Sequence, residues 1–336
     1  MVNHSTQSRE LIAQLNLIIN KPRLPFWTRN KETLAELDGF CKSYHEFRVM
    51  EEGSKMEFQL DYYSGSNKNV LALIQELERA GSQFIECVIL QGSLATNEEV
   101  GYSDLDAMVV LNSRSFQSSK SLMSVIEELW KLYRNVAKQD ILQHHGWFVT
   151  TQELLSTHFD DFFPAQIFKK SCFLYSVSEE ESVKLRLVQD NQLYRKAFMQ
   201  TALQTIKELE TGTYVSNMYN LKSCLSKFML LPSLYYQCTR SKGVYKADSF
   251  QLVKSDFTEK EWEVMDFASE LRQNWRQPQS YWLRFTAILF PSVSRKLVKR
   301  FASRVRPDLK SALEAKRFEM LTFVKRSIQK SEYNKV

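Results

Sequence analysis

The chain has 336 residues and a net charge of +6, and its 43% hydrophobic and 25% charged content is that of an ordinary soluble globular protein of about two domains. No apolar run approaches the ~20 residues that cross a bilayer, and the N-terminal residues lack the basic-then-apolar pattern of a signal peptide. The five scattered cysteines argue against a zinc cluster and for small buried thiols, so we expect a cytoplasmic protein.

The N-terminal part of the sequence predicts helices at residues 8–20 and 31–47, separated by Lys-Pro-Arg-Leu-Pro at residues 21–25. We expect residues 1–63 to form a helical arm that packs on the next domain. Residues 64–68 read Ser-Gly-Ser-Asn-Lys and predict a turn. Val70, Leu73, Ile74 and Leu77 then form an apolar stripe that predicts a helix from Asn69 to Ala80.

The next segment holds two apolar runs joined by a glycine turn and a polar loop. The first run ends at Gly92 and Ser93, and Asp104 and Asp106 open the second. Residues two apart on a strand point to the same face, so the two carboxylates should project together. Like charges repel unless a cation lies between them, and Mg²⁺ is the simplest such cation. Glycine would let the backbone approach a phosphate, to which the serine could donate a hydrogen bond.

Gly-Ser-Leu-Ala-Thr at residues 92–96, followed by Gly-Tyr-Ser-Asp-Leu-Asp at residues 101–106, resembles the signature of the polymerase-beta-like nucleotidyltransferase superfamily. The resemblance implies that Gly92 and Ser93 grip the triphosphate of a nucleoside triphosphate. It implies that Asp104 and Asp106 hold two Mg²⁺ ions, and that a third carboxylate on a later strand completes the site. It also implies a small mixed sheet with helices on one face, which we place at residues 64–177.

The third carboxylate has no obvious candidate in the sequence. After an amphipathic helix marked by apolar residues from Leu122 to Val136, residues 140–151 predict another strand, and this strand presents His144 and His145. Asp140 comes too early, in the expected turn before the strand. Either a histidine fills the third position, in which case Mn²⁺ could replace Mg²⁺, or the site only binds nucleotide. Adjacent strand residues face opposite sides, so at most one histidine should face the cleft.

From about Ser178 onward the sequence predicts helices, with apolar periodicity over residues 183–210, 214–237, 258–275 and 308–329. Glycine is almost absent from this part, which is typical of a helical bundle over residues 178–336. We therefore expect an α+β protein: a small mixed nucleotidyltransferase sheet with helices on one face, followed by an α-helical bundle domain.

A basic loop and Lys246 follow the helix predicted at residues 214–237. This order resembles the C-terminal helical domain of aminoglycoside-type nucleotidyltransferases, in which a lysine at the start of a helix reaches the triphosphate. The resemblance implies the same role for Lys246, with Lys222 and Arg240 as alternatives. A lysine is a suitable point charge for a triphosphate.

Charge is uneven along the chain: residues 286–336 carry thirteen Lys or Arg against four Asp or Glu, a balance of +9, and the remainder sums to −3. This segment is either a solvated helix face or a surface that binds anions. The motif favours transfer of a nucleoside monophosphate to a hydroxyl-type acceptor, with a small molecule favoured over RNA because no RNA-binding module or interleaved aromatics are visible. The rivals are a non-catalytic nucleotide-binding or interaction module and an RNA-modifying enzyme that uses the basic segment.

Overall fold

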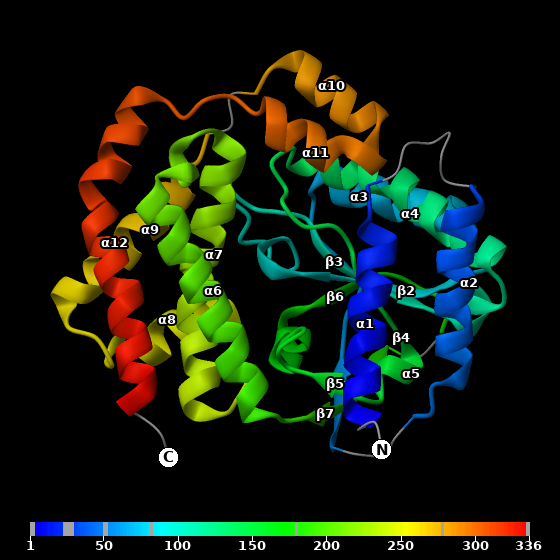
Figure 1. Ribbon diagram of the computed structural model, residues 1–336. Helices are drawn as coiled ribbons and strands as arrows, with labels where there is room; N and C mark the ends of the chain where they lie inside the picture. The colour runs from blue at the N-terminus through cyan, green and yellow to red at the C-terminus, as the bar shows by residue number, and fades with distance from the viewer. Residues whose placement is uncertain are drawn as a thin grey trace.

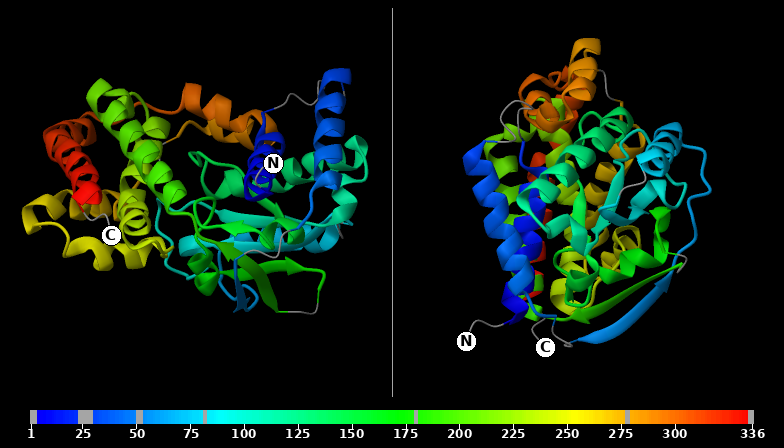
Figure 2. Two further views of the ribbon diagram at one scale, coloured as in Figure 1. Left: turned by 60° about the horizontal axis from the view of Figure 1, so that its bottom comes forward. Right: turned by 90° about the vertical axis from the view of Figure 1, so that its right-hand side faces the viewer.

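The computed structural model describes residues 4–22, 30–49, 53–80, 83–178, 181–276 and 279–333. It is an α+β structure in which two small mixed sheets and their helices lie beside a helical half (Figures 1 and 2). In the described residues, no helix is both long enough and apolar enough to cross a bilayer.

The larger sheet has the strand order β4-β3-β2-β6. Strand β2 is antiparallel to both β3 and β6, whereas β3 is parallel to β4. Strands β2 and β3 are nearly continuous apolar runs because both of their faces are buried. The strands are β2 (Ile85–Gln91), β3 (Asp106–Leu111), β4 (Phe148–Thr151) and β6 (Cys172–Ser176).

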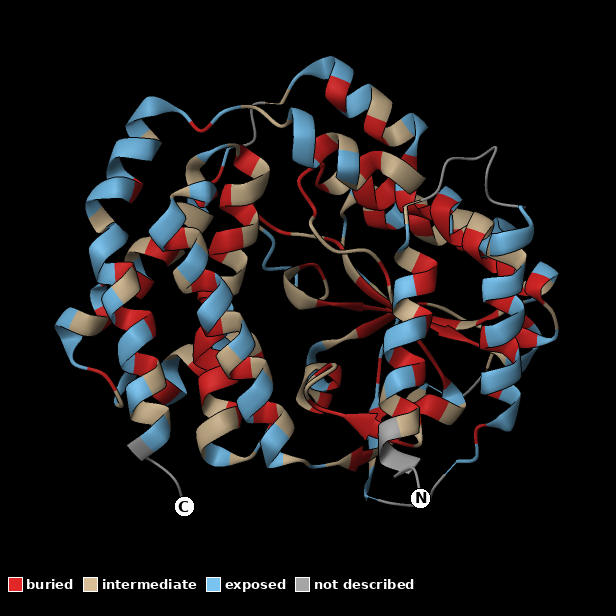
Figure 3. Ribbon diagram, in the orientation of Figure 1, coloured by how far each residue is buried: buried red, intermediate tan, exposed pale blue. Residues whose placement is uncertain are grey.

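Helices cover one face of this sheet. Val88 and Val109 on that face share a core with the apolar stripes of α1, α2, α3 and α4. Buried and exposed residues alternate along α1 and α2 in Figure 3. The four helices are α1 (His4–Asn20), α2 (Lys31–Glu46), α3 (Lys68–Ala80) and α4 (Ser119–Gln139), close to the helices that the periodicity predicts.

Two asparagines of α1 hold this helix against the start of β4. The amide of Asn16 donates to the carbonyl of Val149 at 2.7 Å and accepts from its N–H at 2.9 Å. Asn20, one turn later, does the same for Trp147 at 2.8 and 2.9 Å. Residues four apart on a helix thus meet residues two apart at the start of an edge strand, so the side-chain amides satisfy backbone groups on its open edge.

A second sheet covers the opposite face of the first. Its order is β1-β7-β5, with β1 (Ser54–Gln59) antiparallel and β5 (His158–Phe159) parallel to β7 (Ser182–Val188). Phe58 and Leu185 pack there against Ile89 and Met108 of the larger sheet. The predicted helical arm therefore contains a strand, and the helical prediction is wrong over residues 182–188. The boundary expected at residue 178 separates strands that pair with each other.

The helical half forms its own core, shown on the left of Figure 1. Helices α10 and α11 lie over α4 and connect the two halves. Side-chain caps fix several starts: Asp190 caps α6, Asn217 caps α7, and Thr258 forms a capping box with Glu261 in α9. The helices are α6 (Asn191–Thr211), α7 (Met218–Arg240), α8 (Lys246–Lys254), α9 (Glu259–Gln273), α10 (Tyr281–Leu289), α11 (Pro291–Phe301) and α12 (Pro307–Tyr333).

Short elements complete the chain. They are the helix α5 (Gln152–Leu155) and the 3₁₀ turns η2 (Gly92–Leu94), η3 (Ser113–Phe116), η4 (Ala165–Lys170) and η5 (Thr213–Val215). The first of these turns follows β2 directly and forms the Gly-Ser turn that the sequence predicts.

Candidate functional site

A cavity of about 480 Å³ lies where the larger sheet meets the helical half. Its walls come from η2, the start of β3, the loop before β4, the η4 region and helices α7, α8 and α9. All of the site residues predicted from the sequence line this one cavity: Gly92, Ser93, Asp104, Asp106, His144, His145 and Lys246. The fold thus brings together residues that lie as far apart in the sequence as Gly92 and Lys246.

The Gly-Ser turn requires a glycine at its first position. Gly92 has a φ of +70°, and a Cβ built on it would lie 3.3 Å from Oδ2 of Asp106. A side chain at this position would both strain the backbone and crowd the acid pair. The hydroxyl of Ser93 donates to Ser103 at 2.8 Å, so it would have to leave this partner in order to donate to a phosphate.

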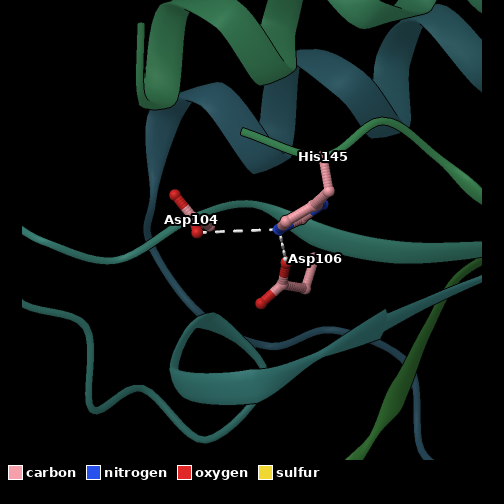
Figure 4. A group of neighbouring side chains, drawn as sticks. All are labelled: Asp104, Asp106 and His145. Carbon is pink, nitrogen blue, oxygen red and sulfur yellow. Dashed lines mark ion pairs between the residues drawn. The ribbon is translucent and has the colours of Figure 1, made fainter. Parts of the chain in front are cut away.

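His145 lies between the two aspartates (Figure 4). Its Nε2 atom is 2.8 Å from Oδ1 of Asp106 and 3.6 Å from Oδ2 of Asp104. Strand β3 begins at Asp106, so Asp104 lies just before the strand rather than within it. The two carboxylates still approach the same imidazole, which makes a cluster of two acids and one base.

Both histidines reach the cluster, which corrects the prediction that only one would. Nδ1 of His144 lies 3.9 Å from Oδ2 of Asp104. Residues 141–147 form a loop instead of the predicted strand, so the alternation of a strand does not apply to them. Gln143 anchors this loop, because its side chain exchanges two hydrogen bonds with the backbone of Leu105, at 3.2 and 3.0 Å.

A buried lysine holds the other side of Asp104. The Nζ atom of Lys222, on α7, donates to Oδ1 of Asp104 at 2.5 Å, to the carbonyl of Tyr102 at 2.7 Å and to Oδ2 of Asp140. These three bonds use every donor of the ammonium group. The side chain is fully buried, so it cannot swing towards a phosphate in the cavity. Asp140 caps the end of α4 and serves this lysine instead of the histidine cluster.

The surrounding charges fix the protonation of the cluster. Burial opposes ionisation of Asp104, but Lys222 and His145 hold the pKa of that carboxyl well below its usual range. Burial raises the pKa of Asp140 to about 7, against the attraction of Lys222. Two carboxylates therefore share one buried cation, and Asp104 is the one that stays ionised.

The two imidazoles differ in charge. Burial alone would lower the pKa of His145, but Asp106 and Asp104 raise it well above the ordinary value. Burial and the neighbouring His145 lower the pKa of His144 to about 3, so this ring stays neutral. A proton on His145 would offset one of the two negative charges beside it.

Lys246 is one of the cations that the helical half presents to the cavity. It is the first residue of α8, and no ion-pair partner for it occurs in the described part of the chain. Burial and the nearby Arg272, which also lines the cavity, lower the pKa of Lys246 to about 8. Of the alternatives, Lys222 is enclosed and Arg240 pairs with Asp256. The geometry therefore favours Lys246 among the three candidate cations.

The cluster fits a divalent cation. One ligand atom from each of Asp104, Asp106 and His145 can be chosen so that all three lie within 4.8 Å of one another. Oδ1 of Asp106 is buried and accepts no well-directed hydrogen bond from the described residues. Two carboxylate oxygens suit Mg²⁺, and the imidazole nitrogen makes Mn²⁺ equally suitable.

Sequence reasoning missed three features of this site. The Asp140–Lys222 pair has a signal, because Lys222 occupies a position among the buried residues Leu221, Cys224 and Leu225 of α7, where a lone charge needs a partner. Arg272 has no local signal. The aromatic wall formed by Phe148, Phe162 and Phe163 depends on the η4 region folding back towards the cluster.

Comparison with protein-family models gives no match, and comparison with curated protein sequences gives none either. The functional argument therefore rests on the residues of the cavity and on the resemblance of the Gly-Ser and Asp-x-Asp segments.

Proposed function

We propose that this protein is a nucleotidyltransferase that moves a nucleoside monophosphate from a nucleoside triphosphate to a hydroxyl-type acceptor. One observation carries the proposal: the Gly92 turn, the acid pair with His145, and the unpaired cation Lys246 line the same cavity although they come from different elements. A triphosphate needs backbone approach, metal ligands and a counter-charge together. The volume of about 480 Å³ suits a ligand of nucleotide size.

In the proposed reaction the residues of the cavity mainly position the nucleotide and neutralise the charge of its phosphates. Gly92 admits the phosphates close to the backbone, while Lys246 and Arg272 offset their charge from the helical half. Mg²⁺ or Mn²⁺ held by Asp104, Asp106 and His145 would offset further charge and make an acceptor hydroxyl more acidic. The free thiols of all five cysteines, four of them buried, favour a cytoplasmic setting for this enzyme.

Two Mg²⁺ ions are expected from the resemblance, but the ligands present favour one. Lys222 takes Oδ1 of Asp104, which leaves Oδ2 to face His145. We propose that the ammonium of Lys222 supplies the charge that a second ion would bring, and that one divalent cation binds at the opposite oxygen. A buried lysine whose ammonium group donates to three acceptors stays charged, so this side of Asp104 needs no metal ion from solution.

The transfer itself is tested with nucleoside triphosphates labelled at the α- or the γ-phosphate, incubated with the protein, Mg²⁺ or Mn²⁺ and cell extract. Nucleotidyl transfer should place the α label in a new product and the γ label in pyrophosphate. Asp106→Asn is the matched inactive control, because it removes a ligand and leaves the Lys222–Asp104 pair in place. Transfer of the γ label to an acceptor would contradict the proposal.

The number of ions is tested separately by Mn²⁺ titration in the presence of a non-hydrolysable nucleotide, with bound Mn²⁺ counted by electron paramagnetic resonance. We expect one tightly bound ion per chain. Two ions would contradict the role given to Lys222 but leave nucleotidyl transfer possible, whereas no bound ion would contradict both.

One observation favours a second candidate, a nucleotide-binding module without catalysis. The cluster holds a histidine where the resemblance implies a third carboxylate. Nucleotide binding that depends on Lys246, together with failure of either label to move in any extract, would support the module over the enzyme.

A further inference from the structure

A second pocket of about 420 Å³ lies between α1, the start of α7 and α11. His144 lines both this pocket and the larger cavity, so the two spaces meet at this residue. The ring is also the one whose Nδ1 lies 3.9 Å from Oδ2 of Asp104. A molecule in the second pocket would therefore be separated from the acid pair by one side chain.

The lining of this pocket is basic. Arg295, Lys296 and Lys299 of α11 face Lys21 across it, and none of the lining residues is acidic. Lys21 pairs with Glu36, and Arg295 donates to the carbonyl of Asn20. Lys296 and Lys299 are exposed and have no acidic partner among the residues that the structure describes. Four cationic side chains, three on α11 and one just after α1, thus line this pocket, and Lys21 alone among them has an acidic partner in the described part of the chain.

The rest of the basic C-terminal segment behaves differently. Five cations of α12 have acidic partners on α6, α9 or α12 itself, so their charge is largely balanced. The five are Lys310, Lys316, Lys325, Arg326 and Lys330. The unbalanced positive charge that we can place near the site therefore belongs to α11, at the second pocket.

We propose that the second pocket binds the anionic group, a phosphate or a carboxylate, of a small acceptor molecule. The anion would lie against Lys296 and Lys299, and the acceptor hydroxyl would lie at His144. The acceptor role rests on the proposed function; the anion site does not. In-line displacement needs the acceptor and the leaving group on opposite sides of the reacting phosphorus, and two spaces that meet at one side chain allow that arrangement.

A small molecule fits this pocket better than a nucleic acid strand. A strand needs a continuous row of unpaired cations with aromatic side chains for its bases. Five cations of α12 have acidic partners, and the pocket volume of about 420 Å³ suits one compact group. RNA binding is accordingly an outcome that would count against the inference.

The test uses inorganic phosphate, titrated into the full-length protein by low-affinity calorimetry. Lys296→Gln/Lys299→Gln removes two exposed charges from the pocket, and Lys310→Gln/Lys316→Gln removes two from α12 as the matched control. Lys246→Gln reports on the larger cavity. We expect two phosphate sites in the unaltered protein. The double substitution Lys296→Gln/Lys299→Gln, here called the pocket pair, should weaken phosphate binding at one site about tenfold, and Lys246→Gln should weaken it only at the other.

The outcomes separate this inference from the proposed function. One phosphate site, lost in the pocket pair and insensitive to Lys246→Gln, would support the second pocket and contradict the triphosphate site. Two sites that both survive in the pocket pair would overturn the inference alone. Equal weakening of phosphate binding by the pocket pair and by the control Lys310→Gln/Lys316→Gln would also overturn it. The effect would then come from the overall positive charge of the surface and not from a site. Single-stranded RNA that binds more tightly than glycerol 3-phosphate and loses affinity in the pocket pair would contradict a small acceptor.

Discussion

Asp104 and Asp106 carry the same charge two residues apart, but their surroundings differ. The side chain of Asp104 is 11% exposed and contacts Lys222, whereas that of Asp106 is 33% exposed and has His145 as its ion-pair partner among the residues that the structure describes. The repulsion between them is therefore offset from within the protein, on one side by an ammonium and on the other by an imidazole. Removing one charge should therefore have a larger effect on stability at Asp104 than at Asp106.

Asp104→Asn should lower the free energy of unfolding of the metal-free protein by about 3 kcal/mol, because the buried ammonium of Lys222 loses an ionic partner. Asp106→Asn should change it by less than about 1 kcal/mol, since its partner is partly exposed. Urea denaturation at neutral pH measures both. Equal effects of the two substitutions would show that Lys222 does not distinguish the aspartates.

The pKa of Lys246 predicts how phosphate binding depends on pH. Because that pKa is lowered to about 8, the amine is charged below pH 8 and loses its proton as the pH rises through that value. Affinity for inorganic tripolyphosphate should be constant near neutral pH and fall roughly tenfold per pH unit above pH 8. Lys246→Arg should remove this fall, because guanidinium stays charged. The same pH profile in both proteins would exclude Lys246 from the phosphate site.

Among single residues, the sequence predicts those that belong to a local motif, but it does not predict the residues that they contact. Gly92 and Asp106 follow from spacing alone. The contact of Lys222 with Asp104 joins residues 118 positions apart, and no periodicity encodes it. The two histidines were found, but their common orientation depends on Gln143 holding a loop where a strand was expected.

Among the elements, the turn η2 links fold and site most directly. Gly92 and Gly212 both have positive φ angles, +70° and +69°, but only a Cβ on Gly92 would meet another atom, Oδ2 of Asp106. The two glycines therefore separate backbone strain from crowding of the acid pair. Such a matched pair is useful because each carries the same conformational requirement.

Gly92→Ala and Gly212→Ala should each lower the free energy of unfolding by about 1 kcal/mol, the cost of a left-handed residue with a Cβ. Only Gly92→Ala should also weaken tripolyphosphate and Mn²⁺ binding, because its methyl group lies beside Asp106. Thermal denaturation and calorimetry measure the two effects. Ligand binding that is unchanged in folded Gly92→Ala protein would remove the turn from the site.

The elements predicted best are those with long, local periodicity, such as α3, α4 and the buried strand β2. Strand β7 was read as the start of a helix although Val183, Leu185 and Leu187 alternate with exposed or half-buried residues. Its partner β1 lies more than a hundred residues earlier, and short strands are stable only when paired. The second sheet could not be predicted from local pattern for that reason.

Across the whole molecule, the two halves share buried groups at the site. Tyr102, Ile141 and Leu142 come from the sheet half but belong to the core of the helical half. Lys222 extends in the opposite direction, from α7 to Asp104 and Asp140. The division into domains at residue 178 therefore describes the order of the sequence better than it describes the packing.

Lys222→Met should lower the free energy of unfolding by about 4 kcal/mol, because it leaves the buried, ionised carboxylate of Asp104 without its cation. Adding Asp140→Asn should change it further by less than about 1 kcal/mol, because burial raises the pKa of Asp140 to about 7 and its carboxyl takes up a proton once the cation is gone. Lys227→Met on the same helix is the matched control, since Lys227 pairs with Glu208 inside the helical half and at a more exposed position. A loss of stability no larger than that of the control would mean that the ion pairs of Lys222 do not hold the two halves together.

The ion pairs of Lys222 with Asp104 and Asp140 also set an order of events during synthesis. Asp104 leaves the ribosome well before Lys222, so a growing chain that already contains the whole Gly-Ser and Asp-x-Asp segment still has no cation for its acid pair. The sheet half cannot reach its final arrangement until α7 has emerged and docked. For the same reason, exchanging the helical half for that of another protein would yield a working centre only if the incoming helix supplied a lysine at the position of Lys222.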